Sequence, residues 1–201
     1  MDKLSYALGV SVGHNLVQSG VTELNADDFA QAVKIMLENG KPAISYEEVN
    51  AVLSEFFGQK EKAEEVKKAS AKEKNMQEGL DFLNENKQRE NVVTLASGLQ
   101  YEIMKAGEGK KPGAKDKVQC HYHGTLIDGT VFDSSVLRNE PAVFGVNQVI
   151  QGWVEALQLM PVGSKWKLFI PSNLAYGTAG AGASIGPNAT LIFEVELLAI
   201  V

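Results

Sequence analysis

The sequence predicts an α+β protein, in which an all-helical N-terminal module with one long connecting helix precedes a mostly antiparallel sheet. Three observations lead to this class. Apolar residues recur at helical spacing through the first half of the chain, whereas from Gly98 onward they alternate with polar residues at a period of two. In addition, the pair Asp128-Gly129, a typical hairpin signal, lies between two apolar runs.

Two short helices are expected first. Residues 4–18 carry leucine or valine at every fourth position, and they are followed by Gly20, a residue that favours helix ends. Residues 26–39 come directly after Asn25, whose side chain can accept hydrogen bonds from the first backbone N–H groups of a helix. Gly40 then marks the end of this second helix.

A third, much longer helix begins at the capping box formed by Ser45 and Glu48 and is expected to continue to about residue 92. Ten of the seventeen residues at 59–75 are charged, so its middle is expected to be exposed to solvent on all sides. Gly58 and Gly79 are the two positions at which this helix could break, because glycine weakens a helix interior.

The second half is expected to form the sheet together with one short helix. Residues 151–159 have helical spacing. Strands are expected where apolar residues alternate, at residues 99–103, 118–122, 166–170 and 191–197. We therefore expect two domains: a helical module with its linker helix at residues 1–93, and a sheet domain at residues 94–201.

Composition argues against several functions. The chain of 201 residues has a net charge of −6, which disfavours binding to a nucleic-acid backbone. No apolar stretch reaches the ~18 residues of a membrane span, and the start MDKLSYALGV lacks the pattern of an export signal. With Cys120 as the single cysteine, these features predict a cytoplasmic protein without a membrane partner; a periplasmic location is expected only if an export signal has been removed.

An unusual set of residues in the second half predicts an apolar pocket. Five aromatic residues are spread over about 70 positions, and the ionisable residues suited to meet a ligand among them are Asp133 and Arg138. The aromatic set comprises Tyr122, Phe132, Trp153, Tyr176 and Phe193. Such a set provides apolar walls with one or two polar groups, which is typical of a binding pocket.

Three other chemistries are disfavoured. His121 and His123 share one strand face but lack a nearby third ligand, so no metal is expected. The glycine-rich segment 177–186 lacks the ending of a phosphate-binding loop, so no cofactor is expected, and we interpret the segment as a mobile flap over the pocket. Ser134 lies outside any nucleophile elbow, which disfavours a serine hydrolase. A hydrolase that uses Ser134 is kept as a rival hypothesis.

At this point the motifs resemble a known family. The strings CHYHGTLIDGTVFDSS, VIQGWVEAL, IPSNLAYG and TLIFEVEL make residues 94–201 similar to the FKBP-type peptidyl-prolyl cis/trans isomerases. The N-terminal helices with a long connecting helix resemble the bacterial subfamily typified by Mip and its cytoplasmic relatives. The resemblance implies a twisted antiparallel half-barrel sheet wrapped on a short helix, and an enzyme that assists protein folding by isomerising prolyl bonds without a cofactor.

The resemblance also implies roles for individual residues. It makes the catalytic pocket Tyr122, Phe132, Asp133, Trp153, Tyr176 and Phe193, and the substrate-binding rim Arg138, Val149, Ile150 and Ile185. Within this set, Trp153 is the implied pocket floor, and Tyr176 and the backbone N–H of Ile150 are the implied donors to substrate carbonyl groups. The resemblance also implies macrolide inhibitors as a further ligand class. Ala142 and Gln148 stand where many members have phenylalanine and glutamate, and these departures affect the rim of the pocket and the binding of such inhibitors.

The implied partners are proline-containing peptides and unfolded proteins, with chaperone-like binding. A homodimer through residues 1–57 is expected, because Gly9 and Gly13 share one helix face and an apolar stripe covers residues 49–57. The alternative from another class is a holdase or adaptor chaperone whose isomerase pocket is vestigial. An assay of proline isomerisation on a short peptide separates these hypotheses.

Overall fold

The computed structural model describes the backbone of residues 1–201 and all side chains except those of Lys60, Glu61 and Glu64. Contacts divide the chain into two compact units, Met1–Glu61 and Lys62–Val201, each of which is described by itself. The boundary expected at residue 93 follows a change of secondary structure rather than a change of contacts, and it stays a prediction.

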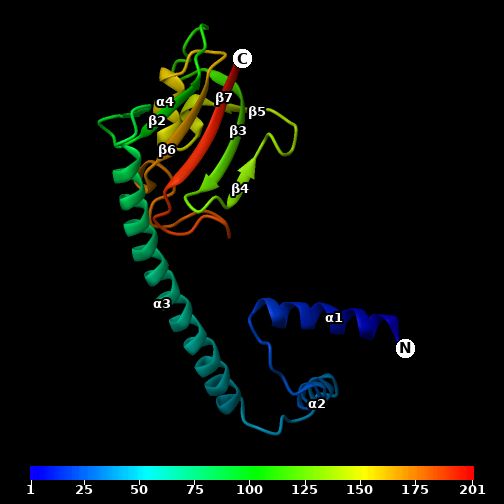
Figure 1. The fold of residues 1–201 in the computed structure, drawn as a ribbon. Helices are drawn as coiled ribbons and strands as arrows, with labels where there is room; N and C mark the ends of the chain where they lie inside the picture. Colours follow the sequence, from blue (N-terminus) through cyan, green and yellow to red (C-terminus); the bar gives the residue numbers. More distant parts are fainter. The chain divides into compact units, whose positions relative to one another are not determined.

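The first unit contains two helices and the beginning of a third (Figure 1). Helix α1 is Lys3–Gln18, α2 is Ala26–Leu37 and α3 is Tyr46–Asn86. The predicted N-cap is confirmed, because Asn25 Oδ1 accepts the Asp27 and Asp28 N–H groups at 3.0 and 3.2 Å. No residue of α1 or α2 is buried within the described chain.

The capping box at the start of α3 is also confirmed. The Glu48 N–H donates to Ser45 Oγ at 3.1 Å, and the Ser45 N–H donates to Glu48 Oε2 at 3.1 Å. The helix continues without a break through Gly58 and Gly79. Its end was expected near residue 92, which is wrong: α3 ends at Asn86, whose buried side chain donates to Gln100 Oε1 at 2.8 Å.

The second unit is built on a seven-stranded, open antiparallel sheet. The strands are β1 Val92–Thr94, β2 Gln100–Lys105, β3 Lys117–Leu126, β4 Val131–Ser134, β5 Ala142–Gly145, β6 Lys165–Ile170 and β7 Leu191–Ile200. Their order is β1-β2-β6-β7-β3-β4, and β5 also pairs with β3. The α+β class is confirmed. The periodicity did not indicate β1, because its three residues are held by pairing with β2.

The hairpin at Asp128-Gly129 joins β3 and β4, although its loop is longer than the two residues that the pair usually indicates. The Leu126 N–H donates to Thr130 O at 2.9 Å, so three residues form the loop. Gly129 has a φ of 86°, a left-handed conformation that glycine adopts without strain. Asp128 Oδ1 accepts the Thr130 N–H at 2.9 Å and stabilises the turn.

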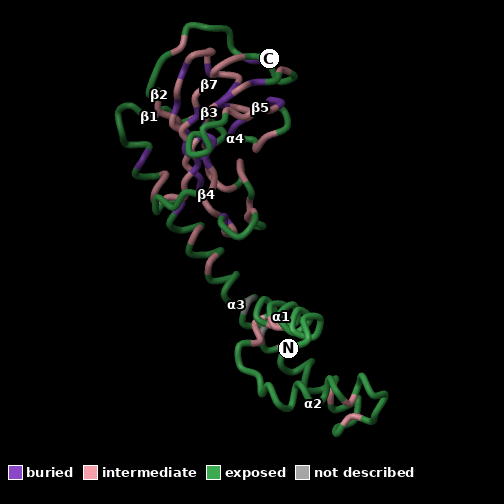
Figure 2. The backbone as a smooth tube through the Cα atoms, turned by 90° about the vertical axis from the view of Figure 1, so that its right-hand side faces the viewer, coloured by how far each residue is buried: buried purple, intermediate pink, exposed green. Residues whose placement is uncertain are grey.

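One short helix, α4 (Gln151–Leu159), supplies the core against which the sheet packs. Its apolar face, with Trp153, Ala156 and Leu157, is buried. Alternate residues of β7 are buried as predicted: Leu191, Phe193, Val195 and Leu197. In Figure 2 the buried segments gather in the strands, whereas α1 and α2 are almost wholly exposed. The second unit therefore has a conventional apolar core, and α1 and α2 have none of their own.

Two 3₁₀ turns complete this unit. They are η1 (Val146–Gln148), before α4, and η2 (Ser172–Leu174), after β6. Within the described residues, every helix is too short or too polar to cross a bilayer.

Candidate active site

A cavity of about 700 Å³ in the second unit opens beside α4. Nine of the ten residues that the sequence indicated line it, and the tenth, Arg138, contacts two of the nine. The lining members are Tyr122, Phe132, Asp133, Val149, Ile150, Trp153, Tyr176, Ile185 and Phe193. They come from β3, β4, β7, α4 and the connecting loops, so only the tertiary fold assembles them.

Trp153 forms the centre of the aromatic wall. Its ring meets Tyr122, Phe144 and Phe193 edge-on, with centroid distances of 5.6, 5.6 and 5.3 Å. Phe132 meets Phe193 in the same way at 5.3 Å. Edge-to-face contacts are a favoured geometry of aromatic rings, so each ring holds its neighbour in place. Trp153 is only 4% exposed, and its Nε1–H has no partner among the described residues.

A small hydrogen-bonded network lies at one side of the cavity. The Tyr122 hydroxyl donates to Asp133 Oδ2, and the Arg138 guanidinium donates to Asp133 Oδ1. Arg138 Nη2 also donates to the Tyr122 hydroxyl oxygen at 2.9 Å. All three polar side chains are therefore paired with one another, and the network fixes the charges of Asp133 and Arg138 beside the aromatic wall.

Protonation in this network follows from the balance of burial and hydrogen bonding. Burial opposes the charge of Asp133, but hydrogen bonds from Tyr122 and Arg138 and the nearby guanidinium charge outweigh it and hold the pKa of Asp133 below its ordinary value. Burial, together with the hydrogen bond to Asp133, raises the pKa of Tyr122. At neutral pH the network is thus a carboxylate, a neutral phenol and a guanidinium.

These directions predict a flat pH profile for isomerisation. Because the pKa of Asp133 lies below the ordinary value of about 3.9, the carboxylate stays charged and stabilises the fold at higher pH. This contribution disappears as the pH falls through the folded pKa. We expect kcat/KM to be constant from about pH 5 to about pH 9 and to decline only in more acidic solution. NMR exchange spectroscopy on a proline peptide measures this directly, and a titration centred between pH 6 and 8 would contradict it.

The rim of the cavity contains the remaining predicted residues. Ile150 is the N-cap residue of α4, at the helix end where backbone N–H groups lack intrahelical partners. Residues 181–185, within the segment interpreted as a flap, also line the cavity. Two backbone hydrogen bonds close this segment into a turn: the Ala181 N–H donates to Ile185 O at 2.9 Å, and the Ile185 N–H donates to Ala181 O at 3.1 Å.

The sequence reasoning missed several residues of the site. Phe144 lines the cavity, as does Gln148, which the resemblance had placed at the rim, and a Cβ at Gly124 would lie 2.7 Å from the Phe132 ring and 2.8 Å from the Phe193 ring. Alternation within residues 142–145 would have indicated that Phe144 shares a face with Ala142. Nothing in the sequence indicated the role of Gly124, because the rings that require its missing side chain lie on β4 and β7.

Two pairs of a serine with a strand histidine resemble a nucleophile with a base: Ser134 with His123, and the fully buried Ser135 with His121, whose Nδ1 lies 3.1 Å from Ser135 Oγ. His123 Nδ1 lies 2.9 Å from Ser134 Oγ, so these strand histidines are not simply solvent-facing. However, Ser134 is only 4% exposed, and its Oγ accepts the Leu137 N–H at 3.2 Å. A nucleophile must reach its substrate, and this hydroxyl instead stabilises the turn after β4. Among the described residues, no group of three or more His, Cys, Asp and Glu is arranged to hold a metal ion.

A sheet wrapped on a helix, with an aromatic cavity bordered by a fixed polar network, defines a ligand-binding domain with a mostly apolar pocket. Comparison with known proteins specifies the family. Residues 108–198 match the family model of the FKBP-type peptidyl-prolyl cis-trans isomerases, and residues 1–103 match the model of the domain amino terminal to them. The chain belongs to the FKBP-type peptidyl-prolyl cis-trans isomerase family.

Individual relatives agree over nearly the whole chain. The FKBP-type 22 kDa peptidyl-prolyl cis-trans isomerase of Escherichia coli K12 is 48% identical over 196 residues, covering 98% of this chain and 93% of its own. Outer membrane protein MIP of Legionella longbeachae is 46% identical over 202 residues, covering 99% and 85%. The crystal structure of FkpA from Escherichia coli has a TM-score of 0.74 at 35% identity, covering 98% and 95%. The protein is therefore a peptidyl-prolyl cis-trans isomerase that acts in protein folding.

Proposed function

We propose that the cavity beside α4 is the catalytic site of this isomerase. In this proposal the catalytic surface comprises Tyr122, Phe132, Asp133, Trp153, Tyr176 and Phe193, and the flanking peptide binds at Arg138, Val149, Ile150 and Ile185. The observation that supports it most strongly is the convergence of these residues on one cavity of about 700 Å³. Clefts of this size with apolar walls and few polar groups are typical of ligand sites.

The proposed mechanism relies on the electronic character of the prolyl amide. Rotation about this bond has a barrier of about 18–20 kcal/mol because twisting removes the resonance of the planar amide. The planar form is more polar than the twisted form, so removal of water by the aromatic wall disfavours the planar form. An interaction that favours the twisted form over the planar one is what accelerates the reaction. No bond is broken, so the reaction requires no activated nucleophile in the cavity.

The polar groups have a separate role in this mechanism. The ion pair of Asp133 with Arg138 holds the Tyr122 hydroxyl by hydrogen bonds. In the proposal this network faces the carbonyl group of the rotating amide. Tyr176, which lines the opening and is 41% exposed, is placed to donate its hydroxyl to a flanking carbonyl group. Preorganised polar groups of this kind stabilise a developing charge distribution without having to reorient.

The two tryptophans provide a direct test of where substrate binds. Both are only 4% exposed, but Trp153 lines the cavity, whereas Trp166 stacks on Tyr101 with a centroid distance of 4.3 Å. We expect titration with a short proline peptide to shift the indole N–H resonance of Trp153 and to leave that of Trp166 in place. Equal shifts of both resonances, or a shift of the Trp166 resonance alone, would contradict the assignment of the cavity as the substrate site.

We further propose that the N-terminal unit forms a homodimer through residues 1–57. Support comes from the apolar side chains that a single chain leaves in solvent, since contiguous exposed apolar surfaces mark interaction sites. Those with more than two fifths of their surface exposed include Leu4, Leu8, Val33, Met36, Val52, Leu53, Phe56 and Phe57. A helical module without buried residues gains the stability of a core only by association.

A dimer with two catalytic domains would also bind unfolded chains in two places at once, which is the basis of the proposed chaperone activity. A holdase with a vestigial pocket remains the alternative for that activity, and the family membership together with the complete aromatic set disfavours it. The division into a dimerisation module at residues 1–93 and a catalytic domain at residues 94–201 belongs to the same proposal.

Two finer points are also proposals. Macrolide inhibitors would enter the same cavity, where Gln148 and residues 181–184 form the rim. The cytoplasmic location expected from composition stays a prediction without support from the comparisons, since one relative is named an outer membrane protein. Cell fractionation of the native protein tests the location.

A further inference from the structure

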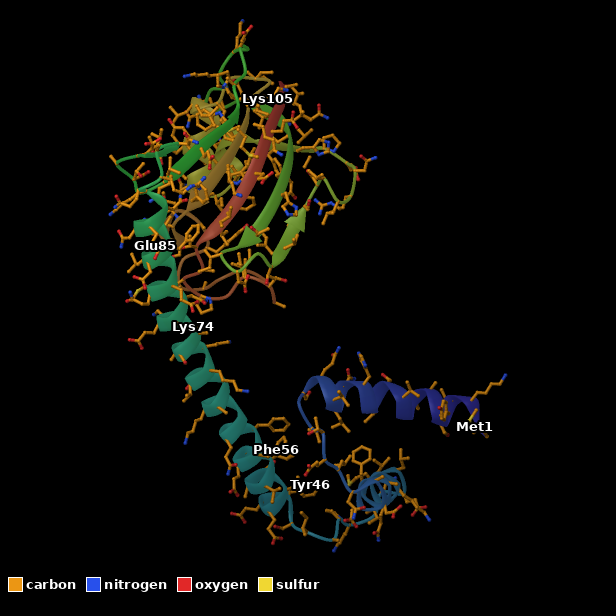
Figure 3. All side chains as sticks on the ribbon, viewed as in Figure 1. Met1, Tyr46, Phe56, Lys74, Glu85 and Lys105 are labelled. Atoms are coloured by element: carbon orange, nitrogen blue, oxygen red, sulfur yellow. The ribbon has the colours of Figure 1, made fainter. Side chains whose placement is uncertain are left out.

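The segment between η2 and β7, residues 175–190, connects the cavity to helix α3. We call it the pocket loop. Its tip, residues 181–185, lines the cavity, and its base, residues 186–190, lies against the middle of α3. The part of α3 that makes this contact begins at Lys72 and continues beyond the labelled Lys74 toward Glu85 (Figure 3). It lies within the second unit.

Helix and loop exchange side-chain hydrogen bonds at this contact. Asn75 Nδ2 donates to Pro187 O at 2.8 Å, and Asn188 Nδ2 donates to Lys72 O at 3.2 Å. Asn188 is only 7% exposed and has a φ of 55°, so its backbone conformation is an unusual one held by its surroundings. These two hydrogen bonds from side-chain amide groups join segments more than 100 residues apart and fix the position of the loop along the helix.

Gly79 explains how closely the two segments approach. It is buried, and a Cβ there would fall on Thr190 Oγ1 and lie 3.3 Å from Thr190 Cβ. Asn75 and Gly79 are four residues apart, so they share the helix face that meets the loop. Glycine weakens a helix interior. Its presence at position 79 is therefore accounted for by the space that the loop occupies.

The pocket loop is closed by hydrogen bonds between its two ends and within its tip. The Asn188 N–H donates to Gly177 O at 2.8 Å, which closes the two ends of the loop on each other. At the tip, Ala181 and Ile185 exchange two backbone hydrogen bonds. Because the loop is held at its ends and at its tip, we expect a displacement of the base by α3 to shift the tip, which contains Ile185, and the neighbouring Tyr176.

We propose that Asn75 and Gly79 are positioning residues for substrate binding, because they hold the pocket loop against α3 in the conformation that completes the cavity. Neither touches the cavity itself. The proposal rests on the catalytic role proposed above for that cavity. It makes part of the linker helix, which lies outside the expected catalytic domain of residues 94–201, a determinant of substrate affinity.

The test uses Gly79→Ala in the full chain, with Gly58→Ala as the matched control. Both changes replace glycine by alanine within α3, but a Cβ at Gly58 would meet nothing within 4 Å. We expect Gly79→Ala to raise KM for a proline peptide roughly fivefold with kcat within about twofold, since the rim binds ground state and transition state alike. We expect Gly58→Ala to change neither constant.

Two further measurements separate positioning from general damage. In Gly79→Ala, amide hydrogen exchange should accelerate at Ala181 and Ile185 and remain unchanged at Leu168 and Val195 in the sheet. Adding Thr190→Ala removes the hydroxyl that the new methyl group strikes, so the double variant should return KM to about twice the wild-type value or less. Asn75→Ala introduces no steric clash and removes the hydrogen bond to Pro187 O. It should therefore also raise KM, and it tests the proposal even if Gly79→Ala folds poorly.

The outcomes distinguish this proposal from the one on which it rests. If Gly79→Ala and Asn75→Ala leave KM and loop exchange unchanged while Asp133→Leu lowers kcat/KM by about tenfold or more, the positioning role is wrong and the catalytic site stands. If substitution of Asp133 has no effect, the catalytic assignment is wrong, whereas accelerated exchange at Ala181 and Ile185 would still show that α3 holds the loop.

Discussion

Replacement of Asp133 by leucine is expected to lower kcat/KM for a proline peptide by about 10- to 100-fold. The carboxylate accepts hydrogen bonds from both Tyr122 and Arg138. Hydrogen bonds to charged groups contribute about 1.5–3 kcal/mol, and each 1.4 kcal/mol corresponds to about a tenfold change in rate. Loss of the carboxylate removes both of these hydrogen bonds and leaves the guanidinium without its counter-charge beside the aromatic wall. Exchange spectroscopy on the peptide measures the change without a coupled protease.

Asp133→Asn is the matched control for this experiment. It keeps the shape of the side chain and an oxygen that accepts from Tyr122, but it removes the charge that pairs with Arg138, so its activity should lie between those of wild type and Asp133→Leu. The Asp133 side chain is 42% exposed, so the melting temperature should change little in either variant. Isomerisation at the wild-type rate in a folded Asp133→Leu variant would refute the proposed site.

Replacement of Phe56 by glutamate is expected to convert a dimer into a monomer. Phe56 packs edge-on against Phe57 at 5.3 Å, and each ring is still 44% exposed in the single chain. Burial of an unpaired carboxylate against apolar side chains is strongly unfavourable, so the charge should disrupt the interface. Light scattering should give a mass of twice 21.7 kDa for the wild type and a single 21.7 kDa for the variant.

The same variant separates catalysis from chaperone activity. Its kcat/KM for a short peptide should be unchanged, whereas its effect on refolding of a proline-limited protein should fall by at least about tenfold, because two linked sites bind a long chain more tightly than one. Val66→Glu is the control, since it places the same charge at an exposed apolar position of α3 beyond residue 57. A monomeric wild type at micromolar concentration would overturn the dimer proposal.

Local signals in the sequence were the most reliable guides to structure. The capping box of Ser45 and Glu48 and the N-cap at Asn25 involve hydrogen bonds over two or three residues, so their geometry follows from neighbouring positions. The alternation in residues 191–197 predicted a strand with one buried face for a similar reason.

The site was predictable for a different reason. Periodicity and composition indicated an apolar pocket with polar groups, and the resemblance to a family indicated which residues form it. The structure brings the predicted residues together around one cavity, whereas their individual roles stay proposals. Phe144 and Gly124 were missed because each matters only through rings contributed by other elements.

By itself, the sequence determined the fold class, the positions of most elements and the chemistry of the pocket, since these depend on periodicity, capping and the kinds of side chain present. Only the tertiary structure decided that α3 ends at Asn86, that β1 exists, and that Gly79 meets Thr190 at the base of the pocket loop. The physical reason is the range of the interactions. Helix caps and strand faces involve neighbouring residues, whereas these contacts join residues that become neighbours only when the sheet and α3 have packed together.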